Sequence, residues 1–337
     1  MKLTTLVRLA AVMLLPVVHV SASDAFFSPD GKTVTALLMH GDVLANINVA
    51  TGKVTPIPLS KPLEEQGVNS IARGADGEIL ALTDKAVWFI KTGEAPKQIA
   101  STAPIESPRA LFVDTKPGSP TLDWLFISGY EKQNASPQTL PAAPSASLYA
   151  RKPGGKGFVE LFCRRTDDPR AGVFSADGRL FIAAGMDLWE GSIQTNDDAD
   201  APTIGTLVGA RIAALGVLNT DDSNGGSMSV ERIATAGRWI YCVLRGHHMA
   251  GIVRIPMAAQ PLYSGTGQEQ PTIKQTYAVN AATLSKAEVI ADGIEHADAF
   301  CATEVGGKPL VFYTEDRQLM LWTGSGEPRS IGREAAN

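Results

Sequence analysis

Cysteine is scarce in this chain of 337 residues, which has three: Cys163, Cys242 and Cys301. So few and so widely spaced thiols exclude the dense disulfide framework of small secreted domains. One bridge is allowed, and the odd number would then leave at least one thiol free. Cys242 and Cys301 lie in the apolar, strand-like segments "RWIYCVL" and "DAFCATEV". We expect both to be buried small hydrophobes and not reactive thiols.

Dense blocks of positive charge are also missing. The chain has 30 Lys and Arg against 35 Asp and Glu, which gives a formal net charge of -5. An acidic chain of this kind is a poor partner for nucleic acid or for an anionic membrane surface. The partners that we expect are a protein, a peptide, a glycan or a small molecule.

Long apolar runs are confined to the first residues. Lys2 and Arg8 precede the apolar stretch Leu9–Val20, and small residues follow it, which is typical of a cleavable secretory signal over residues 1–23. Loss of this segment would remove both basic residues and change the formal net charge from -5 to -7. We expect residues 24–337 to form a single soluble, monomeric domain in the periplasm or outside the cell. An uncleaved N-terminal anchor is the alternative.

Compact catalytic signatures are missing as well, since the chain has no HExxH zinc motif, no GxSxG elbow and no phosphate-binding loop. The segment "NDDADAPTIGTL" begins like a calcium loop at Asn196. It has Ala201 where the tight turn needs Gly, and Leu207 where a bidentate Glu belongs. Any catalytic or metal site must therefore be assembled from residues far apart in the sequence.

What the chain does contain is a repeated, strand-rich unit. "AFFSPDGKTVTALLMHGDVLANINVATGKVTPI" and "GVFSADGRLFIAAGMDLWEGSI" share a short apolar segment, a Gly turn, an alternating run and a second turn. The dipeptides Asp30-Gly31, Asp76-Gly77 and Asp177-Gly178 accept the positive φ of a tight hairpin. Units of roughly 40–50 residues predict an all-β propeller, with six blades of four antiparallel strands, or seven if one blade is degraded.

The inner strands of the six units are expected to begin near Ala25, Ser70, Ala110, Gly172, Val230 and Ala297. Gly205–Leu218 is the one stretch with a weak helical pattern.

The segments "FSPDGK" and "FSADGR" resemble the repeats of TolB-type propellers, and "GVNSIARGADGEILALTD" resembles NHL-repeat and gluconolactonase-family blades. The resemblance extends over most of the chain at the level of blades, and it implies the propeller fold more than any activity. The gluconolactonase family places a metal-binding Glu early in its first blade. Here that strand reads "DAFFSPDG" without a Glu, and among the later inner strands only Asn69 lies at a matching position.

Propeller geometry places the turns between second and third strands on the same face as the blade-to-blade connections, where ligands usually bind. The chain has five histidines, one of which, His19, lies in the leader. The other four are expected on this face: His40, His247, His248 and His296. They belong to the fifth, sixth and first units, which become neighbours when the ring closes.

This sector allows two kinds of chemistry. A divalent metal ion would suit imidazole nitrogen combined with carboxylate oxygen. The expected metal ligands are His40, Asp42, His296 and Asp316. In the second kind, His247 and His248 supply a general acid or base, and Arg245 holds an anionic substrate or a developing oxyanion. The simpler interpretation is a solvated hairpin tip without a shared task.

The function we expect is that of a recognition scaffold that binds a protein, peptide or glycan on the loop-rich face, because propellers without a catalytic signature commonly serve as platforms. The alternative is a metal-assisted hydrolase, lactonase or lyase with one divalent metal ion at the channel mouth. A third interpretation is a structural component of an envelope complex, which would need no site.

Overall fold

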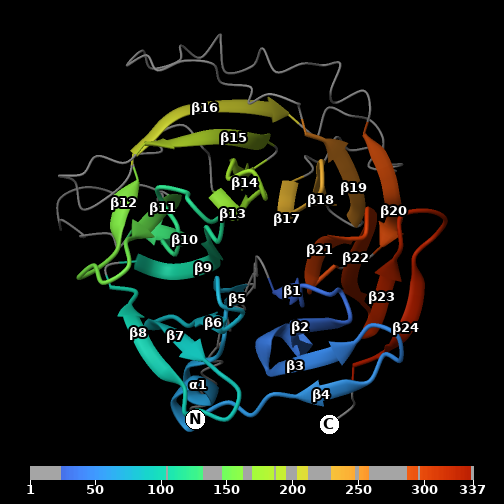
Figure 1. The fold of residues 1–337 in the computed structure, drawn as a ribbon, viewed down its shortest axis with the longest axis horizontal. Helices are drawn as coiled ribbons and strands as arrows, with labels where there is room; N and C mark the ends of the chain where they lie inside the picture. Colours follow the sequence, from blue (N-terminus) through green and yellow to red (C-terminus); the bar gives the residue numbers. More distant parts are fainter. Residues whose placement is uncertain are drawn as a thin grey trace, which may run out of the picture.

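The computed structural model describes residues 24–103, 105–131, 146–161, 169–185, 187–194, 203–211, 229–246, 250–257, 287–294 and 297–334. These residues form six four-stranded sheets, arranged as blades around a central opening (Figure 1). The prediction of a six-bladed, all-β propeller is confirmed.

Each blade consists of four consecutive antiparallel strands that run outward from the centre (Figure 1). The first two blades are β1 (Ala25–Phe27), β2 (Thr33–Leu38), β3 (Val43–Asn48), β4 (Val54–Pro56) and β5 (Ser70–Arg73), β6 (Ile79–Leu82), β7 (Ala86–Ile90), β8 (Lys97–Ser101). The next two are β9 (Ile105–Val113), β10 (Leu125–Glu131), β11 (Ala146–Arg151), β12 (Val159–Leu161) and β13 (Pro169–Phe174), β14 (Leu180–Ala184), β15 (Asp187–Gln194), β16 (Thr203–Arg211). The last two are β17 (Ser229–Ala236), β18 (Trp239–Arg245), β19 (Ala250–Pro256), β20 (Glu288–Ile294) and β21 (Phe300–Val305), β22 (Lys308–Glu315), β23 (Gln318–Trp322), β24 (Arg329–Arg333).

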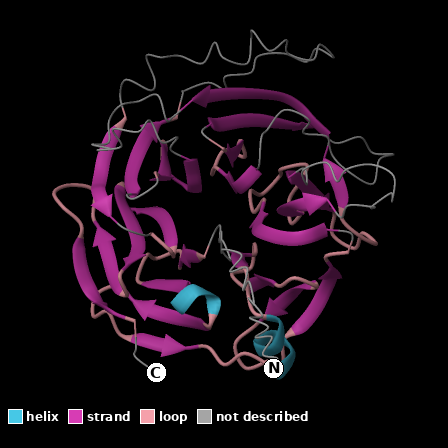
Figure 2. Ribbon diagram, turned by 180° about the vertical axis from the view of Figure 1, so that it is seen from behind, coloured by secondary structure: helices cyan, strands magenta, loops and turns pink. Residues whose placement is uncertain are grey.

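Two short helices interrupt this pattern (Figure 2). They are the 3₁₀ turn η1 (Met39–Gly41) and the helix α1 (Lys61–Gln66), which lies in the connection from β4 to β5. A proline in the first turn favours the start of α1, and Gly67, with a φ of 69°, follows its end. The buried Leu63 anchors the helix to the blade core.

Three kinds of local prediction need correction. The weak helical pattern of Gly205–Leu218 is wrong for its described part, because residues up to Arg211 belong to the outer strand β16. There, cross-strand pairing with β15 outweighs a weak helical pattern. The repeat pattern also predicts a turn between the second and third strands of the third unit over Gly129–Lys132, which is wrong at its start because β10 continues to Glu131. The inner strands β9 and β13 begin earlier than expected, at Ile105 and Pro169, because each includes an irregular first segment.

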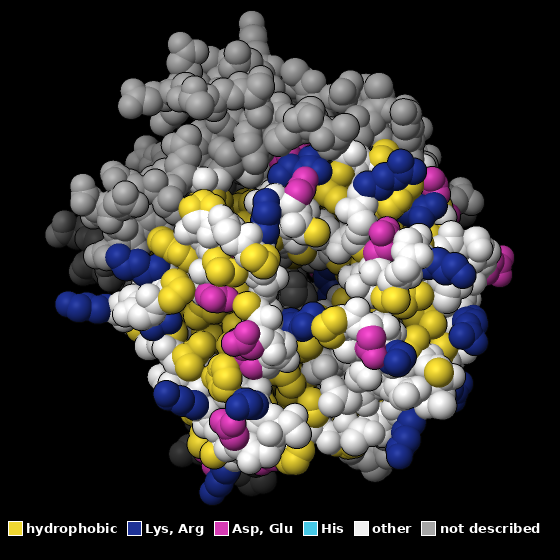
Figure 3. Space-filling view, in the orientation of Figure 1, with side chains coloured by type: hydrophobic (Ala, Val, Ile, Leu, Met, Phe, Trp, Pro, Cys, Tyr) yellow, Lys and Arg dark blue, Asp and Glu magenta, His cyan; other side chains and the backbone are white. Residues whose placement is uncertain are grey.

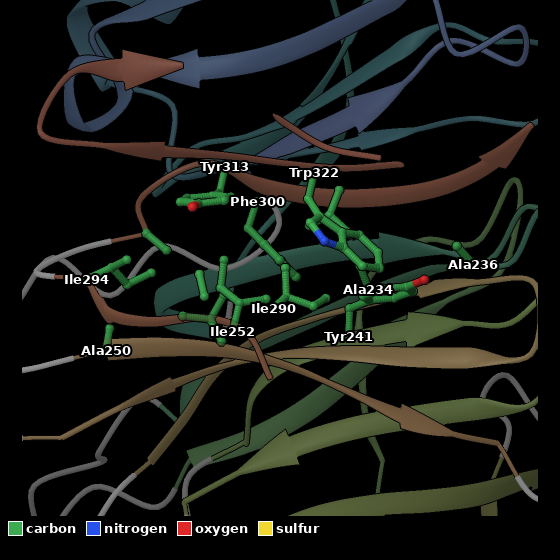
Figure 4. Close-up of a cluster of buried hydrophobic side chains, with 14 residues drawn as sticks. Ala234, Ala236, Tyr241, Ala250, Ile252, Ile290, Ile294, Phe300, Tyr313 and Trp322 are labelled. Atoms are coloured by element: carbon green, nitrogen blue, oxygen red, sulfur yellow. The ribbon is translucent and has the colours of Figure 1, made fainter. Parts of the chain in front are cut away.

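The hydrophobic core lies between neighbouring blades. In the cluster of Figure 4, Tyr241 and Ile290 of the fifth blade pack against Phe300, Tyr313 and Trp322 of the sixth. Each fully buried side chain of this size stabilises the fold by roughly 1.5–3 kcal/mol. Similar clusters join the other blades, so stability depends on contacts between adjacent repeats.

The ring closes by packing. The first and last sheets contain only their own consecutive strands, so among the described residues no strand is exchanged between them. Phe27 and Val34 of the first blade share one buried cluster with Cys301 and Phe312 of the sixth. No helix of the described residues is long and apolar enough to cross a membrane.

Cys242 and Cys301 are free and buried, as the sequence predicts, whereas Cys163 lies outside the described residues. Removal from water raises the pKa of both thiols far above its usual value, so little thiolate forms near neutral pH. With a thiol-specific disulfide reagent, we expect Cys242 and Cys301 to react roughly a hundredfold or more slowly in the native chain than in denaturant. A native chain that releases two or three equivalents rapidly would contradict this expectation.

Candidate site at the channel mouth

The predicted site residues fall into two groups. His247, His248 and His296 lie outside the described residues, and only the backbone of His40 is described. The remaining three, Asp42, Arg245 and Asp316, are exposed at the ends of second strands or in the turns that follow them, as expected. Within the described part of the chain, no group of three or more His, Cys, Asp or Glu could hold a metal ion. The metal site and the catalytic histidines therefore stay predictions.

A different set of polar residues occupies the beginnings of the inner strands. In β9, β13 and β17 the pairing with the next strand shifts register near its start. The residue skipped by the shift is Arg170 in β13 and Glu231 in β17, and Arg109 lies in the shifted segment of β9. A β-bulge redirects a side chain and is common beside functional sites. Three consecutive blades thus carry a charged residue at corresponding irregular positions.

The sequence holds a signal for two of these positions that our prediction missed. Pro108-Arg109-Ala110 and Pro169-Arg170-Ala171 repeat the same tripeptide at the start of two adjacent inner strands. Proline has no N–H to donate to a ladder, so it favours an edge or a bulge where it stands within a strand. The repeated tripeptide therefore marks the two positions, Arg109 and Arg170, at which the inner strands depart from regular pairing.

Arg170 is fixed at the joint between the fourth and fifth blades. Its Nη1 donates to the Ser229 Oγ at 3.1 Å and forms an ion pair with Glu231 Oε1. The Ser229 hydroxyl in turn donates to the same Glu231 oxygen at 2.8 Å. The Glu231 side chain is 6% exposed and that of Arg170 is 21% exposed, so the carboxylate partner is the more deeply buried member of the pair.

Contacts connect the segment around Arg170 to the third blade on one side and to the fifth blade on the other. The Ser128 hydroxyl of β10 donates to the Arg170 carbonyl oxygen at 3.2 Å, which ties the third blade to the fourth. Near Ser128 on the same strand, the centroid of the Tyr130 ring lies 4.2 Å from the guanidinium carbon of Arg109, and the two side chains also hydrogen-bond. On the other side, Ser229 pairs in register with Arg245.

A second, deeper ion pair crosses the mouth. The Arg232 Nη2 of β17 lies 3.0 Å from the Asp24 Oδ2 at the start of β1. Their side chains are 8% and 4% exposed, and β21 of the sixth blade contacts both strands. The pair therefore joins the fifth blade to the first across the intervening sixth.

Asn69 has a structural role at the start of β5. Its Nδ2 donates to the Asp84 Oδ1 at 2.7 Å and to the Pro108 carbonyl oxygen at 3.2 Å. These bonds hold the β6–β7 turn and tie the second blade to the third.

Charges of both signs surround the central opening on the face shown in Figure 3, where Lys and Arg side chains alternate with Asp and Glu and with hydrophobic patches. The ring thus has no extended region of one sign on the described part of that face.

No protein-family model and no curated protein matches the chain. Solved structures do. A gluconolactonase from Xanthomonas campestris is 13% identical, with a TM-score of 0.51, over 90% of this chain and 87% of that one. A streptogramin B lyase is 10% identical, with a TM-score of 0.50, over 93% and 84%. A chain of the nidogen/laminin complex is 12% identical, with a TM-score of 0.50, over 87% and 93%. These likenesses confirm the blade-level resemblance, and at such identities they show the fold alone.

Proposed function

We propose that the chain is an exported recognition scaffold that binds a protein, peptide or glycan on the face where the inner strands begin. The observation that carries the proposal is the braced channel mouth. Hydrogen bonds and ion pairs link the second blade to the third, the third to the fourth, the fourth to the fifth and the fifth to the first. A rim held in one geometry loses little freedom on binding, which favours recognition.

A protein partner is in keeping with the likenesses, since propellers of this fold include a chain of the nidogen/laminin complex. They also include a gluconolactonase and a streptogramin B lyase, which keeps the metal-assisted hydrolase, lactonase or lyase as the alternative. Export rests on the leader pattern of residues 1–23, which lie outside the described part of the chain.

The test is a binding screen of the chain without residues 1–23 against arrays of peptides and glycans. Lys85 and Arg317 are exposed in second-to-third turns of the proposed face, and Lys32 and Lys53 are exposed on the hairpins of the opposite face. We expect Lys85→Glu with Arg317→Glu to weaken saturable binding about tenfold or more, because rim charges steer and orient partners. The matched pair Lys32→Glu with Lys53→Glu should change it less than about twofold.

Three results would overturn the scaffold. The first is the absence of saturable binding, and the second is an equal loss of binding in both charge variants. The third is near-stoichiometric metal in the purified chain that disappears in the His40→Ala, His247→Ala double variant. That third result would make the metal-assisted enzyme the leading function and would place its centre in the histidine sector.

A further inference from the structure

We infer that Asp76-Gly77 is a site of spontaneous covalent modification, at which the aspartate converts to isoaspartate through a succinimide. The inference goes beyond the proposed function and does not rest on it. The dipeptide lies in the turn between β5 and β6, on the face opposite the channel mouth. The chain has four Asp-Gly dipeptides, a sequence that favours this reaction because glycine has no side chain to hinder the attacking nitrogen.

The reaction needs no reagent except water. The backbone nitrogen of Gly77 attacks the Asp76 Cγ, and the amide proton and the carboxyl hydroxyl leave together as one water. Water then opens the succinimide ring. Addition at the main-chain carbonyl gives isoaspartate, and addition at the side-chain carbonyl restores aspartate. The aspartate side chain must therefore be free to turn its Cγ toward the nitrogen that follows it.

The first support is a difference between three equivalent turns. The turns of the first and fourth blades read Ser-Pro-Asp-Gly and Ser-Ala-Asp-Gly, and that of the second blade reads Gly-Ala-Asp-Gly. The Ser28 Oγ donates to the Asp30 Oδ1 at 2.7 Å. The Ser175 Oγ donates to the Asp177 Oδ1 in the same way. Gly74 stands in the place of these serines, so the second blade lacks the hydroxyl that fixes the carboxylate.

Further contacts hold the two serine-bound carboxylates and not that of Asp76. Asp30 also accepts from the Lys32 backbone N–H, at 3.1 Å. The Asp177 Oδ2 lies 2.9 Å from the Arg179 Nε. Asp76 is exposed, and within the part of the chain that the structure describes its carboxylate has no hydrogen bond or ion pair. Its side chain can therefore rotate without breaking a contact.

The second support is the freedom of the backbone at Gly77. A Cβ at Gly31 would stand 2.6 Å from the Val305 Cγ2 of the sixth blade. A Cβ at Gly178 would stand 2.7 Å from the Lys116 Cδ of the third blade's β9–β10 connection. Adjacent blades thus pack against both of those turns. Gly77 is exposed, and a Cβ there would meet one side chain within 4 Å, which belongs to the same hairpin.

The fourth dipeptide, Asp292-Gly293, lies inside β20. There the Gly293 N–H donates to the Asp292 Oδ1 at 2.9 Å. That bond aims the in-plane hydrogen of the amide at the carboxylate, whereas attack uses the face of the nitrogen perpendicular to that plane. We expect isoaspartate to form more slowly at this position than at Asp76.

The experiment incubates the chain without residues 1–23 in neutral buffer and measures isoaspartate by peptide mapping. Mapping is needed because Asn224-Gly225 can yield the same product by deamidation. We expect isoaspartate at Asp76 to form roughly tenfold faster than at Asp30 or Asp177, where one or two hydrogen bonds must break first. In urea, which unfolds all three turns, the three rates should agree within about twofold.

Two variants that differ by one oxygen test the cause. Gly74→Ser supplies the hydroxyl of the other turns and should slow the reaction at Asp76 about fivefold. Gly74→Ala is the matched control and should leave the rate within about twofold of the parent's. In both variants the new Cβ meets the flexible end of the Glu78 side chain, so the steric effect is the same.

Three outcomes would overturn the inference: equal rates at the three turns of the native chain, a difference between them that persists in urea, or equal protection by the two variants. None of them bears on the scaffold, which is tested by binding at the opposite face.

Discussion

Replacing Arg232 by Met should lower the free energy of unfolding by about 3–5 kcal/mol, the usual cost of leaving one member of a buried ion pair without its counter-charge. Arg232 lies 3.0 Å from Asp24, and the two side chains are 8% and 4% exposed. Methionine fills much of the volume of the arginine stem, so the loss is electrostatic more than steric. Urea denaturation followed by far-UV circular dichroism measures the change.

Two further variants test whether the loss of stability comes from leaving Asp24 as an unpaired buried charge. Arg329→Met removes an exposed charge from β24 and should change stability by no more than about 0.5 kcal/mol. Asp24→Asn combined with Arg232→Met removes both buried charges and should be more stable than Arg232→Met alone, although it carries one more substitution. If Arg232→Met is as stable as the Arg329→Met control, the pair does not brace the ring.

The blade architecture of this chain can be predicted from local sequence features. Three Asp-Gly dipeptides correctly predict hairpins: Asp30-Gly31, Asp76-Gly77 and Asp177-Gly178. A tight turn needs a residue that tolerates positive φ, and the three glycines have φ values of 67°, 86° and 84°. The starts expected near Ala25, Ser70 and Val230 agree with β1, β5 and β17 within one residue. Such features need only a few neighbouring residues to act, and so they can be recognised from sequence.

The channel mouth could not be predicted in the same way. Asp24 and Arg232 are 208 positions apart, and their meeting depends on the number of blades and on closure of the ring. Arg170 meets Glu231 only because two bulges point residues of adjacent blades toward each other. Non-local ion pairs leave no periodic trace in a single sequence. The repeated Pro-Arg-Ala tripeptide is the one local hint.

The predicted histidine sector illustrates the same limit. Topology places His40 and the turns after β18 and β22 on one face, and the described backbone agrees with that placement. Whether imidazole groups converge depends on side-chain direction, which the strand pattern does not set in a turn. Arg245, which we predicted would hold an anion, contacts the polar residues of the channel mouth through Ser229, with which it pairs across β17 and β18.

Gly52→Ala should destabilise the protein more than Gly93→Ala, although the two glycines occupy the same kind of site. Both follow a threonine in the turn between the third and fourth strands of a blade, and their φ values are 67° and 81°. A left-handed backbone costs a non-glycine residue roughly 1–2 kcal/mol. A Cβ at Gly93 meets nothing within 4 Å, so Gly93→Ala should cost about that much and no more.

At Gly52 the added Cβ would stand 1.8 Å from the carbonyl oxygen of Ile331, on β24 of the last blade. That neighbour is backbone and cannot rotate away, so the first and last blades must move apart. Overpacking of this kind adds roughly 1–3 kcal/mol, and Gly52→Ala should therefore lose about 2–5 kcal/mol in total. Urea unfolding of the two variants side by side isolates the closing contact, since the conformational strain is common to both. Equal losses would show that blades one and six close loosely. A larger loss at Gly52 would show that a ring closed by packing, without an exchanged strand, depends on the close approach that a missing side chain allows.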